Sequence, residues 1–196
     1  MSEQHPFIID DPENLIFRLN RRTLSDPSIL DEERRKVFDR SWIYCGHASE
    51  IPNVGDFETR NVCGRPVIFC RDEDNKVRVF LNSCAHRGAQ VCRERFGNAR
   101  RFYCFYHGWT YGCDGRLKTV PAEDSYPPNF NKERLSLREP PRVEGYRDFW
   151  FISFDSEIMT LDEYLGDAKD YIDLVVEQSP SGRMEIVEGT QEYDVK

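Results

Sequence analysis

Short apolar runs separated by polar or glycine-containing turns fill the chain from residue 51 to residue 154. Residues 67–69 and 77–81 flank the polar segment 72–75, a pattern that predicts a β-hairpin. Residues 101–103 and 149–154 are further short runs of strand-forming residues. The pattern therefore predicts a mainly β unit.

Helical patterns lie on either side of this unit. Residues 28–40 place apolar side chains on one face, Asp26 or Ser28 is the expected N-cap, and Pro27 suits the first turn. Residues 160–176 open with Thr160 and Glu163 at the spacing of a capping box and continue with an apolar stripe. We therefore predict one helix before the β unit and one after it.

Length and composition narrow the class of protein. The 196 residues suit one domain plus an appendage, and the net charge of −8 argues against nucleic acid as a partner. The longest apolar run, residues 149–152, is far shorter than the ~20 residues that span a bilayer. Seven cysteines, an odd number without an apolar leader segment, indicate a reducing compartment, so we expect a cytoplasmic protein.

The candidate chemistry lies in two short runs. Cys84 and His86 form a C-x-H pair, and Cys104 and His107 form a C-x2-H pair 17 residues later. Two thiolates and two imidazoles are the ligands of a Rieske [2Fe–2S] centre, in which histidines replace two cysteines on one of the irons. Both pairs follow predicted strands directly, so we expect the ligand loops to hang from strand ends.

Zinc also takes two cysteines and two histidines, but zinc fingers place the cysteines in one knuckle and the histidines in the other. Here each run carries one of each, which suits a cluster whose two irons differ in their ligands. Gly88 and Gly108 follow the two pairs, where the loop backbone is expected to approach inorganic sulfide closely. We therefore predict that Cys84, His86, Cys104 and His107 bind a [2Fe–2S] cluster and its iron.

These runs resemble the Rieske domain at the N-terminus of ring-hydroxylating, non-haem iron oxygenase α subunits. The resemblance rests on residues 82–88 and 104–109, and extends to residues 42–47, 51–56 and the turn at 114–115. It implies a Rieske domain of small antiparallel sheets, flanked by helices of an incomplete α+β catalytic domain. It also implies that the cysteines bind one iron and the histidines the other.

Rieske proteins of respiratory complexes carry an extra cysteine in each loop and a serine after the second-loop glycine. Here these positions are Ala89, Tyr106 and Trp109, so fewer groups donate to the sulfurs and a lower reduction potential is expected. Trp109 is expected to pack over the cluster, the alternative being an ordered surface on the electron path. Tyr106 is either a hydroxyl donor to the cluster or plain loop packing.

The catalytic iron of such oxygenases sits on two histidines and a carboxylate. After the two predicted ligands only His5 and His47 remain, and residues 185–196 alternate like strands without partners. We therefore expect the N-terminal portion of a longer subunit, without catalytic residues of its own. Its expected parts are an N-terminal helical segment (1–41), the Rieske domain (42–155), and a linker helix with the first strands of a truncated catalytic domain (156–196).

By this resemblance the subunit belongs to an NADH-dependent aromatic ring-hydroxylating oxygenase. The chain would take electrons from a reductase or ferredoxin and pass them to a mononuclear Fe(II) in the missing domain. Trimer-based homo-oligomers, with or without a small β subunit, are implied, and neither nucleic acid nor a membrane is an expected partner. The alternative is a stand-alone Rieske ferredoxin, a class that is usually shorter and lacks the two long helical segments.

Two further features stay open to competing interpretations. Cys45 and His47 form a second C-x-H pair, but without a C-x2-H partner they are expected to be a packed strand end. Residues 85–118 hold seven basic and two acidic side chains, whereas residues 155–194 hold twelve acidic and two basic ones. The basic segment either compensates the charge of the cluster locally or docks an acidic redox partner.

Overall fold

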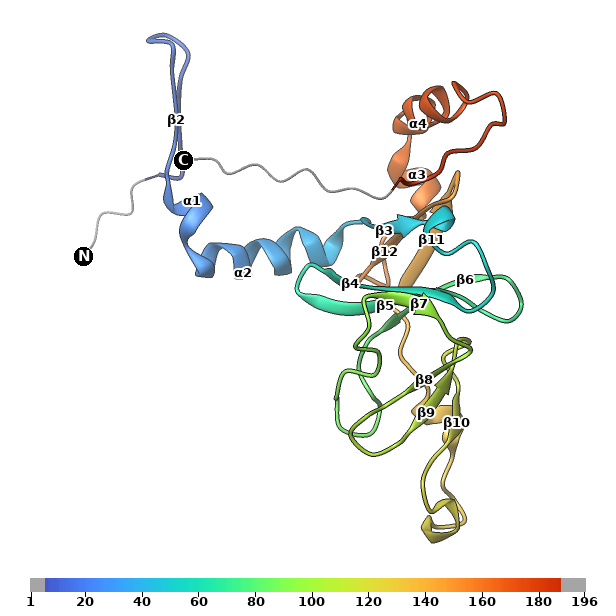
Figure 1. Cartoon of the computed structure of the whole chain (residues 1–196). Coiled ribbons are helices and arrows are strands. Elements are labelled where there is room, and N and C mark those ends of the chain that lie inside the picture. The colour runs from blue at the N-terminus through green and yellow to red at the C-terminus, as the bar shows by residue number, and fades with distance from the viewer. Residues whose placement is uncertain (1–5, 188–196) are drawn as a thin grey trace, which may run out of the picture.

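The computed structural model describes residues 6–187, and within them twelve strands form four antiparallel sheets (Figure 1). The prediction of a mainly β fold is confirmed. The central sheet has the order β6-β5-β4-β7. Its strands are β4 (Asp56–Val62), β5 (Arg65–Arg71), β6 (Val77–Leu81) and β7 (Phe96–Asn98). The predicted hairpin is β5 paired with β6.

Strand β5 is buried on both faces and separates two hydrophobic cores. Ile68 and Cys70 belong to one core, and Val67 and Phe69 to the other; all four are fully buried. Successive side chains of a strand point to opposite faces, so one continuous apolar run serves both cores. The central sheet is therefore the middle layer of the molecule.

The core that contains Val67 and Phe69 is closed by a second sheet of order β11-β12-β3. Its strands are β3 (Ile43–His47), β11 (Arg142–Tyr146) and β12 (Phe149–Ser153). A 3-10 turn, Ala48–Glu50, follows β3 directly. This sheet lies at the end of the molecule nearer the helices (Figure 1).

The other core supports a third sheet of order β10-β9-β8. Its strands are β8 (Arg101–Tyr103), β9 (Thr110–Gly112) and β10 (Leu117–Thr119). Two 3-10 turns, Glu123–Ser125 and Lys132–Leu135, follow it in the chain. This sheet forms the opposite end of the molecule (Figure 1).

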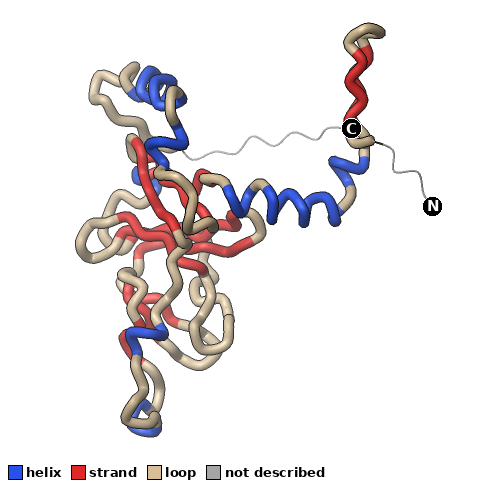
Figure 2. The backbone as a smooth tube through the Cα atoms, turned by 180° about the vertical axis from the view of Figure 1, so that it is seen from behind, coloured by secondary structure: helices blue, strands red, loops and turns tan. Residues whose placement is uncertain are grey.

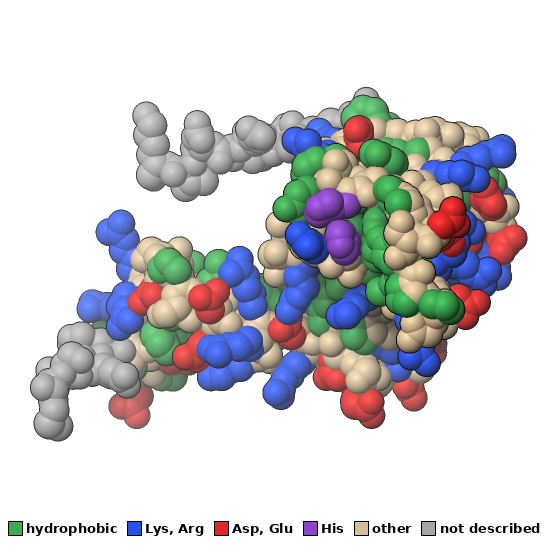
Figure 3. All heavy atoms as spheres, turned by 90° about the horizontal axis from the view of Figure 1, so that it is seen from below, with side chains coloured by type: hydrophobic (Ala, Val, Ile, Leu, Met, Phe, Trp, Pro, Cys, Tyr) green, Lys and Arg blue, Asp and Glu red, His purple; other side chains and the backbone are tan. Residues whose placement is uncertain are grey.

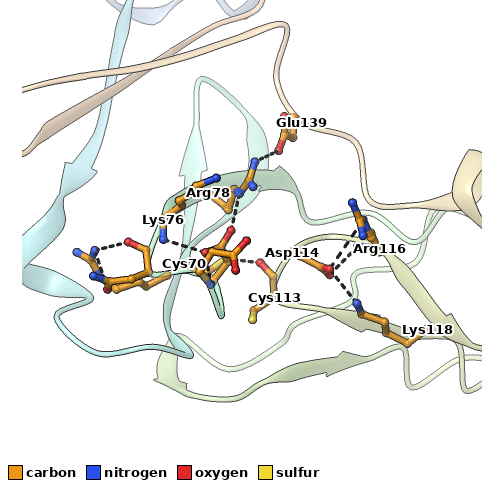
Figure 4. Close-up of polar contacts among 12 residues, drawn as sticks. Cys70, Lys76, Arg78, Cys113, Asp114, Arg116, Lys118 and Glu139 are labelled. Atoms are coloured by element: carbon orange, nitrogen blue, oxygen red, sulfur yellow. Dashed lines mark hydrogen bonds and ion pairs between the residues drawn. The ribbon is translucent and has the colours of Figure 1, made fainter.

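Polar contacts join the central sheet to the third sheet and its flanking segment (Figure 4). The Cys70 thiol donates to the Cys113 carbonyl at 3.6 Å, and Arg78 lies between Asp72 at 2.8 Å and Glu139 at 3.5 Å. Asp72 also accepts two backbone N–H groups of the β5–β6 turn. Burial opposes ionisation of this carboxyl, but these hydrogen bonds outweigh it and hold its pKa below the usual 3.8.

The first predicted helix begins close to its expected residue and ends earlier than expected. Helix α2 covers Pro27–Lys36, and a 3-10 turn, Phe38–Arg40, continues it. Asp26 is the N-cap, because its carboxylate accepts the Ser28 N–H at 3.0 Å. A short helix α1, Arg22–Ser25, precedes it.

The second predicted helix is broken in two. Thr160 and Glu163 form the predicted capping box, but helix α3, Leu161–Leu165, stops at Gly166, and α4 covers Ala168–Val176. Gly166 adopts φ +47°, which a continuous right-handed helix does not allow. The single-helix prediction was therefore wrong at this position.

Residues 1–41 were expected to be a segment with one helix, and beside helices α1 and α2 the structure has a hairpin there that the pattern did not predict. Strands β1 (Ile8–Asp11) and β2 (Ile16–Leu19) form a hairpin that stands away from the other sheets at the end of α1 and α2 (Figures 1 and 2). The adjacent pair Ile8 and Ile9 breaks the alternation that marks a half-buried strand, which is why the pattern gave no strand signal.

At the other end, residues 183–187 have no regular secondary structure, so the expected strand pattern does not begin there. The rest of that pattern, residues 188–196, and His5 lie outside the described residues. Across residues 6–187, none of the helices combines the length and apolar character needed to cross a membrane.

Candidate metal centre

The first ligand loop leaves the end of β6 and is closed by its own backbone. The Cys84 N–H donates to the Ala89 carbonyl at 2.8 Å, and the Gly88 N–H donates to the Cys84 carbonyl at 2.8 Å. Gly88 adopts φ +72°, a conformation that side-chain-bearing residues rarely take. The resulting tight loop presents the side chains of residues 84–86.

The second ligand loop connects β8 to β9 and repeats this geometry. The Cys104 N–H donates to the Trp109 carbonyl at 2.8 Å, and the Gly108 N–H donates to the Cys104 carbonyl at 2.9 Å. Gly108 adopts φ +71°. The two loops therefore share one backbone frame, with a cysteine at its first position and a glycine at its fifth.

Asn82 fixes the first loop to the protein and was not singled out as a structural residue from sequence. Its side chain is 1% exposed, accepts the Val91 and Cys92 N–H groups at 2.9 Å each, and donates to the Cys92 carbonyl at 2.7 Å. These three bonds join the two ends of the segment that contains Cys84 and His86. An asparagine directly before a cysteine-containing loop is a signal, but its partners lie nine and ten residues away.

The two loops bring their histidines together. The ring centroids of His86 and His107 are 4.6 Å apart at an interplanar angle of 73°. Trp109 is 3% exposed, and its ring stacks on the His86 ring with centroids 4.9 Å apart at 11°, so it is a packing residue against a candidate ligand. His86 Nδ1 and His47 Nε2 are the buried side-chain atoms without a hydrogen-bond partner among the described residues, and of the two rings only that of His86 lies beside a second imidazole.

The two candidate cysteines are more deeply buried than the histidines, at 3% exposure for Cys84 and 1% for Cys104. Burial raises the pKa of the Cys84 thiol, and the Cys104 thiol beside it raises the pKa further, while hydrogen bonding from Tyr111 lowers it. A metal ion offsets such a penalty, because a coordinated thiol is deprotonated. The donor set and its burial thus fit an iron–sulfur cluster.

Each iron of a Rieske cluster takes two ligands from the protein. Accordingly, the four candidate residues come as two thiols and two imidazoles from a pair of matching loops. Residues 6–187 contain no group of three or more His, Cys, Asp or Glu side chains around one ion position.

Tyr111 is a residue of this centre that sequence reasoning missed. Its hydroxyl accepts the Ala85 N–H at 3.1 Å and lies 3.1 Å from Cys84 Sγ, to which its own proton is free to donate. The side chain is fully buried, and burial raises the pKa of its hydroxyl, so it remains a phenol. Tyr106, for which the sequence left open a role as hydroxyl donor, is 53% exposed, and its ring centroid lies 3.9 Å from that of His107.

The second C-x-H pair is a packed strand end, as expected. His47 is 1% exposed, its Nδ1 lies 2.8 Å from Ser49 Oγ, and its ring contacts Phe149 at 4.8 Å. Burial raises the pKa of the Cys45 thiol to about 12. The remaining cysteines are also buried or half-buried free thiols, as expected: Cys63, Cys70, Cys92 and Cys113.

Comparison with known proteins gives consistent matches. The model of the family described as Rieske [2Fe–2S] domain matches residues 41–141. The large subunit of anthranilate 1,2-dioxygenase from Acinetobacter baylyi is 38% identical over 93% of this chain and 39% of its own length. The α subunit of biphenyl 2,3-dioxygenase from Rhodococcus jostii is 39% identical over 90% of this chain and 38% of its own length.

Among solved structures, naphthalene 1,2-dioxygenase from Rhodococcus sp., crystallised with indole, superposes with a TM-score of 0.79 at 40% identity. The match covers 83% of this chain and 37% of that chain. The present chain thus spans about two-fifths of the length of the curated relatives it matches.

Proposed function

The chain belongs to the Rieske [2Fe–2S] domain family, and from this we propose that it is the electron-transfer portion of an aromatic-ring-hydroxylating oxygenase α subunit. The observation that carries the proposal is the pair of matching loops, each presenting one cysteine and one histidine from a strand end. Cys84 and Cys104 would hold one iron and His86 and His107 the other. When bound, such a cluster accepts and releases one electron at a time.

The surrounding residues support this role. The two cysteines lie on the side of the site that is buried from water, and Trp109 stacks on the His86 ring and restricts its plane. Tyr111 stabilises the thiolate of Cys84 by a hydrogen bond. The half-exposed histidines lie on the surface side, where an acceptor can approach.

The wider system is proposed from the relatives. Similarity extends over about nine-tenths of the chain, including segments outside residues 41–141, which favours an oxygenase subunit over a stand-alone ferredoxin. Residues 42–155 would form the Rieske unit, and residues 1–41 and 156–196 would belong with a catalytic domain. A mononuclear non-haem iron there would activate O2 on an aromatic substrate. We further propose a cytoplasmic, trimer-based oligomer, with electrons from NADH through a reductase or ferredoxin.

Metal analysis tests the cluster. Chain purified without oxygen should contain about two irons and two acid-labile sulfides per protein. His86→Ala and His107→Ala should each lose the cluster, whereas His47→Ala, checked for fold by circular dichroism, should keep it. One equivalent of zinc without sulfide would contradict the proposal, as would a cluster that survives either ligand substitution.

A further inference from the structure

Next to the second ligand loop lies a groove of about 560 Å³. We call it the arginine–aromatic groove and define it by Arg93, Phe96, Arg101, Tyr103 and Phe105. Its three aromatic side chains are 56–64% exposed, although large aromatic residues are normally buried. Arg, Tyr and Phe are residue types that are enriched in protein–protein interfaces.

The groove is continuous with the candidate metal centre. Phe105 lies in the second ligand loop, directly after Cys104 and two residues before His107, and the Arg93 guanidinium sits 4.8 Å from its ring centroid. Figure 3 views this end of the molecule and shows surface histidine side chains with Lys or Arg and hydrophobic side chains beside them. A partner seated in the groove would contact the ligand loop itself.

Most basic side chains around the site have no acidic partner within the described part of the chain. Five arginines from the two ligand loops and the strands between them are exposed, and none forms an ion pair or donates a side-chain hydrogen bond within residues 6–187. They are Arg87, Arg93, Arg95, Arg100 and Arg101. By contrast, Lys118 of β10 is paired with Asp114 at 2.8 Å (Figure 4).

One acidic residue lines the groove. Glu94 accepts the backbone N–H of Arg93 at 3.2 Å, and its pKa is lowered first by backbone hydrogen bonds and to a smaller extent by the Arg93 charge, so it stays ionised. One carboxylate offsets at most one of the two groove arginines, and within residues 6–187 it forms no ion pair with either. The arginines therefore leave a net positive surface on a chain whose overall charge is −8.

Local compensation of the cluster does not account for this surface. In an oxidised Rieske cluster, two sulfides and two thiolates balance two ferric ions, and the imidazoles are neutral, so the cluster has no net charge. One electron makes it singly negative. Five exposed arginines exceed what a single negative charge requires, which favours the docking interpretation of the basic segment.

We propose that the arginine–aromatic groove docks an acidic electron-donor protein, whose carboxylates pair with Arg93 and Arg101 and whose apolar contact covers Phe105. The proposal rests on the proposed electron-transfer function. Complementary charge raises association rates by about 10- to 1,000-fold at low ionic strength, and this advantage disappears as salt is added. The donor would deliver its electron at the loop that carries Cys104 and His107.

The test uses the cluster-loaded chain and a plant-type [2Fe–2S] ferredoxin of acidic isoelectric point as the donor probe. Such ferredoxins have potentials of about −400 mV, low enough to reduce a Rieske cluster. Affinity between the oxidised proteins is measured by calorimetry at low and high salt, and cluster reduction by stopped-flow absorbance. The variant is Arg93→Glu with Arg101→Glu. The matched control is Arg18→Glu with Arg21→Glu. These two exposed arginines lie on β2 and directly before α1, far from the groove (Figure 1).

At low salt the groove variant should bind at least tenfold more weakly and be reduced at least tenfold more slowly than the unmodified chain. The control should remain within about threefold of the unmodified chain. Reduction by photogenerated deazariboflavin radical, a small neutral reductant, should be equal in all three, because the cluster itself is unchanged.

Equal binding by the groove variant and the control would overturn the docking proposal, as would a salt-independent affinity. Oligomers of the unmodified chain that the groove variant dissociates in sedimentation would also overturn it, because the groove would then join copies of the chain. If no cluster forms at all, the proposed electron-transfer function is contradicted, and the docking proposal that rests on it is contradicted as well. If the cluster forms and the small reductant reduces it, a negative result counts against the groove alone.

Discussion

Asn82→Asp tests whether one buried side chain holds the first ligand loop. The substitution keeps the shape and the acceptor of the Val91 and Cys92 N–H groups, but it replaces the amide donor by an oxygen 2.7 Å from the Cys92 carbonyl. When ionised, the new carboxylate loses one hydrogen bond, faces a carbonyl and is buried at a site that is 1% exposed. When protonated, it can donate to that carbonyl as the amide does.

The magnitude follows from this difference between the two protonation states. The two N–H donors offset part of the burial penalty, which leaves the ionised form about 2–3 kcal/mol worse than the protonated form, or about two pKa units. The folded-state pKa of the new carboxyl is thus raised from about 4 to about 6. Because the pKa is higher in the folded than in the unfolded state, the variant has its full free energy of unfolding below the unfolded-state pKa. It loses part of that free energy as pH rises through the folded-state pKa.

Urea unfolding followed by circular dichroism between pH 4.5 and pH 8 measures this directly. The stability difference between Asn82→Asp and the unmodified chain should grow with pH and level off above about pH 6 at an additional 2–3 kcal/mol. Asn131→Asp is the control, because Asn131 is an exposed N-cap whose oxygen accepts the Glu133 N–H at 2.9 Å, and aspartate caps equally well. A difference for Asn82→Asp that is constant or shrinks with pH would refute the reasoning.

Three further predictions test other contacts of the site and its support. Tyr111→Phe removes the hydroxyl 3.1 Å from Cys84 Sγ and should lower the reduction potential by about 40–80 mV in film voltammetry; an unchanged potential would mean that the hydroxyl does not donate to the sulfur. Asp72→Ala should cost about 1–3 kcal/mol at pH 7 in urea unfolding. Because the folded pKa of Asp72 is lowered below 3.8, that difference should close as pH falls through the folded value, and a cost that persists there would point to another cause. Gly88→Ala and Gly108→Ala impose the same strain at φ near +70°, but only the latter places a Cβ 3.0 Å from neighbouring atoms, so it should be the more destabilising; equal losses would mean that the neighbours yield freely.

What the sequence could predict here is mostly local chemistry. The ligand pairs are two and three residues apart, and the Asp26 cap and the Thr160 capping box involve contacts within three residues. Such patterns depend on backbone geometry that each segment adopts by itself, so they can be read without the fold. The same holds for the β5–β6 hairpin, whose turn joins two neighbouring runs.

The local pattern was misleading where the competing signal was equally local. The apolar stripe of residues 160–176 continues past Gly166, yet a positive φ at that residue ends α3 and starts a new helix. The hairpin at residues 8–19 lacks clean alternation, and its pairing is seen only in three dimensions.

Contacts between distant segments were decided by tertiary structure alone. Tyr111 reaches Cys84 across 27 residues, because β9 runs beneath the first ligand loop. The apolar run around Val67 predicted a strand. That its alternate side chains belong to two different cores was decided by the two sheets that pack on its opposite faces. Charge counting showed that residues 85–118 are basic, and the fold decided that Arg93 and Arg101 line one groove with exposed aromatic rings beside a ligand loop. Sequence thus determined which candidate ligands are present, because the donor type is a property of single residues. The fold determined what surrounds them, because burial and pairing are properties of segments brought together.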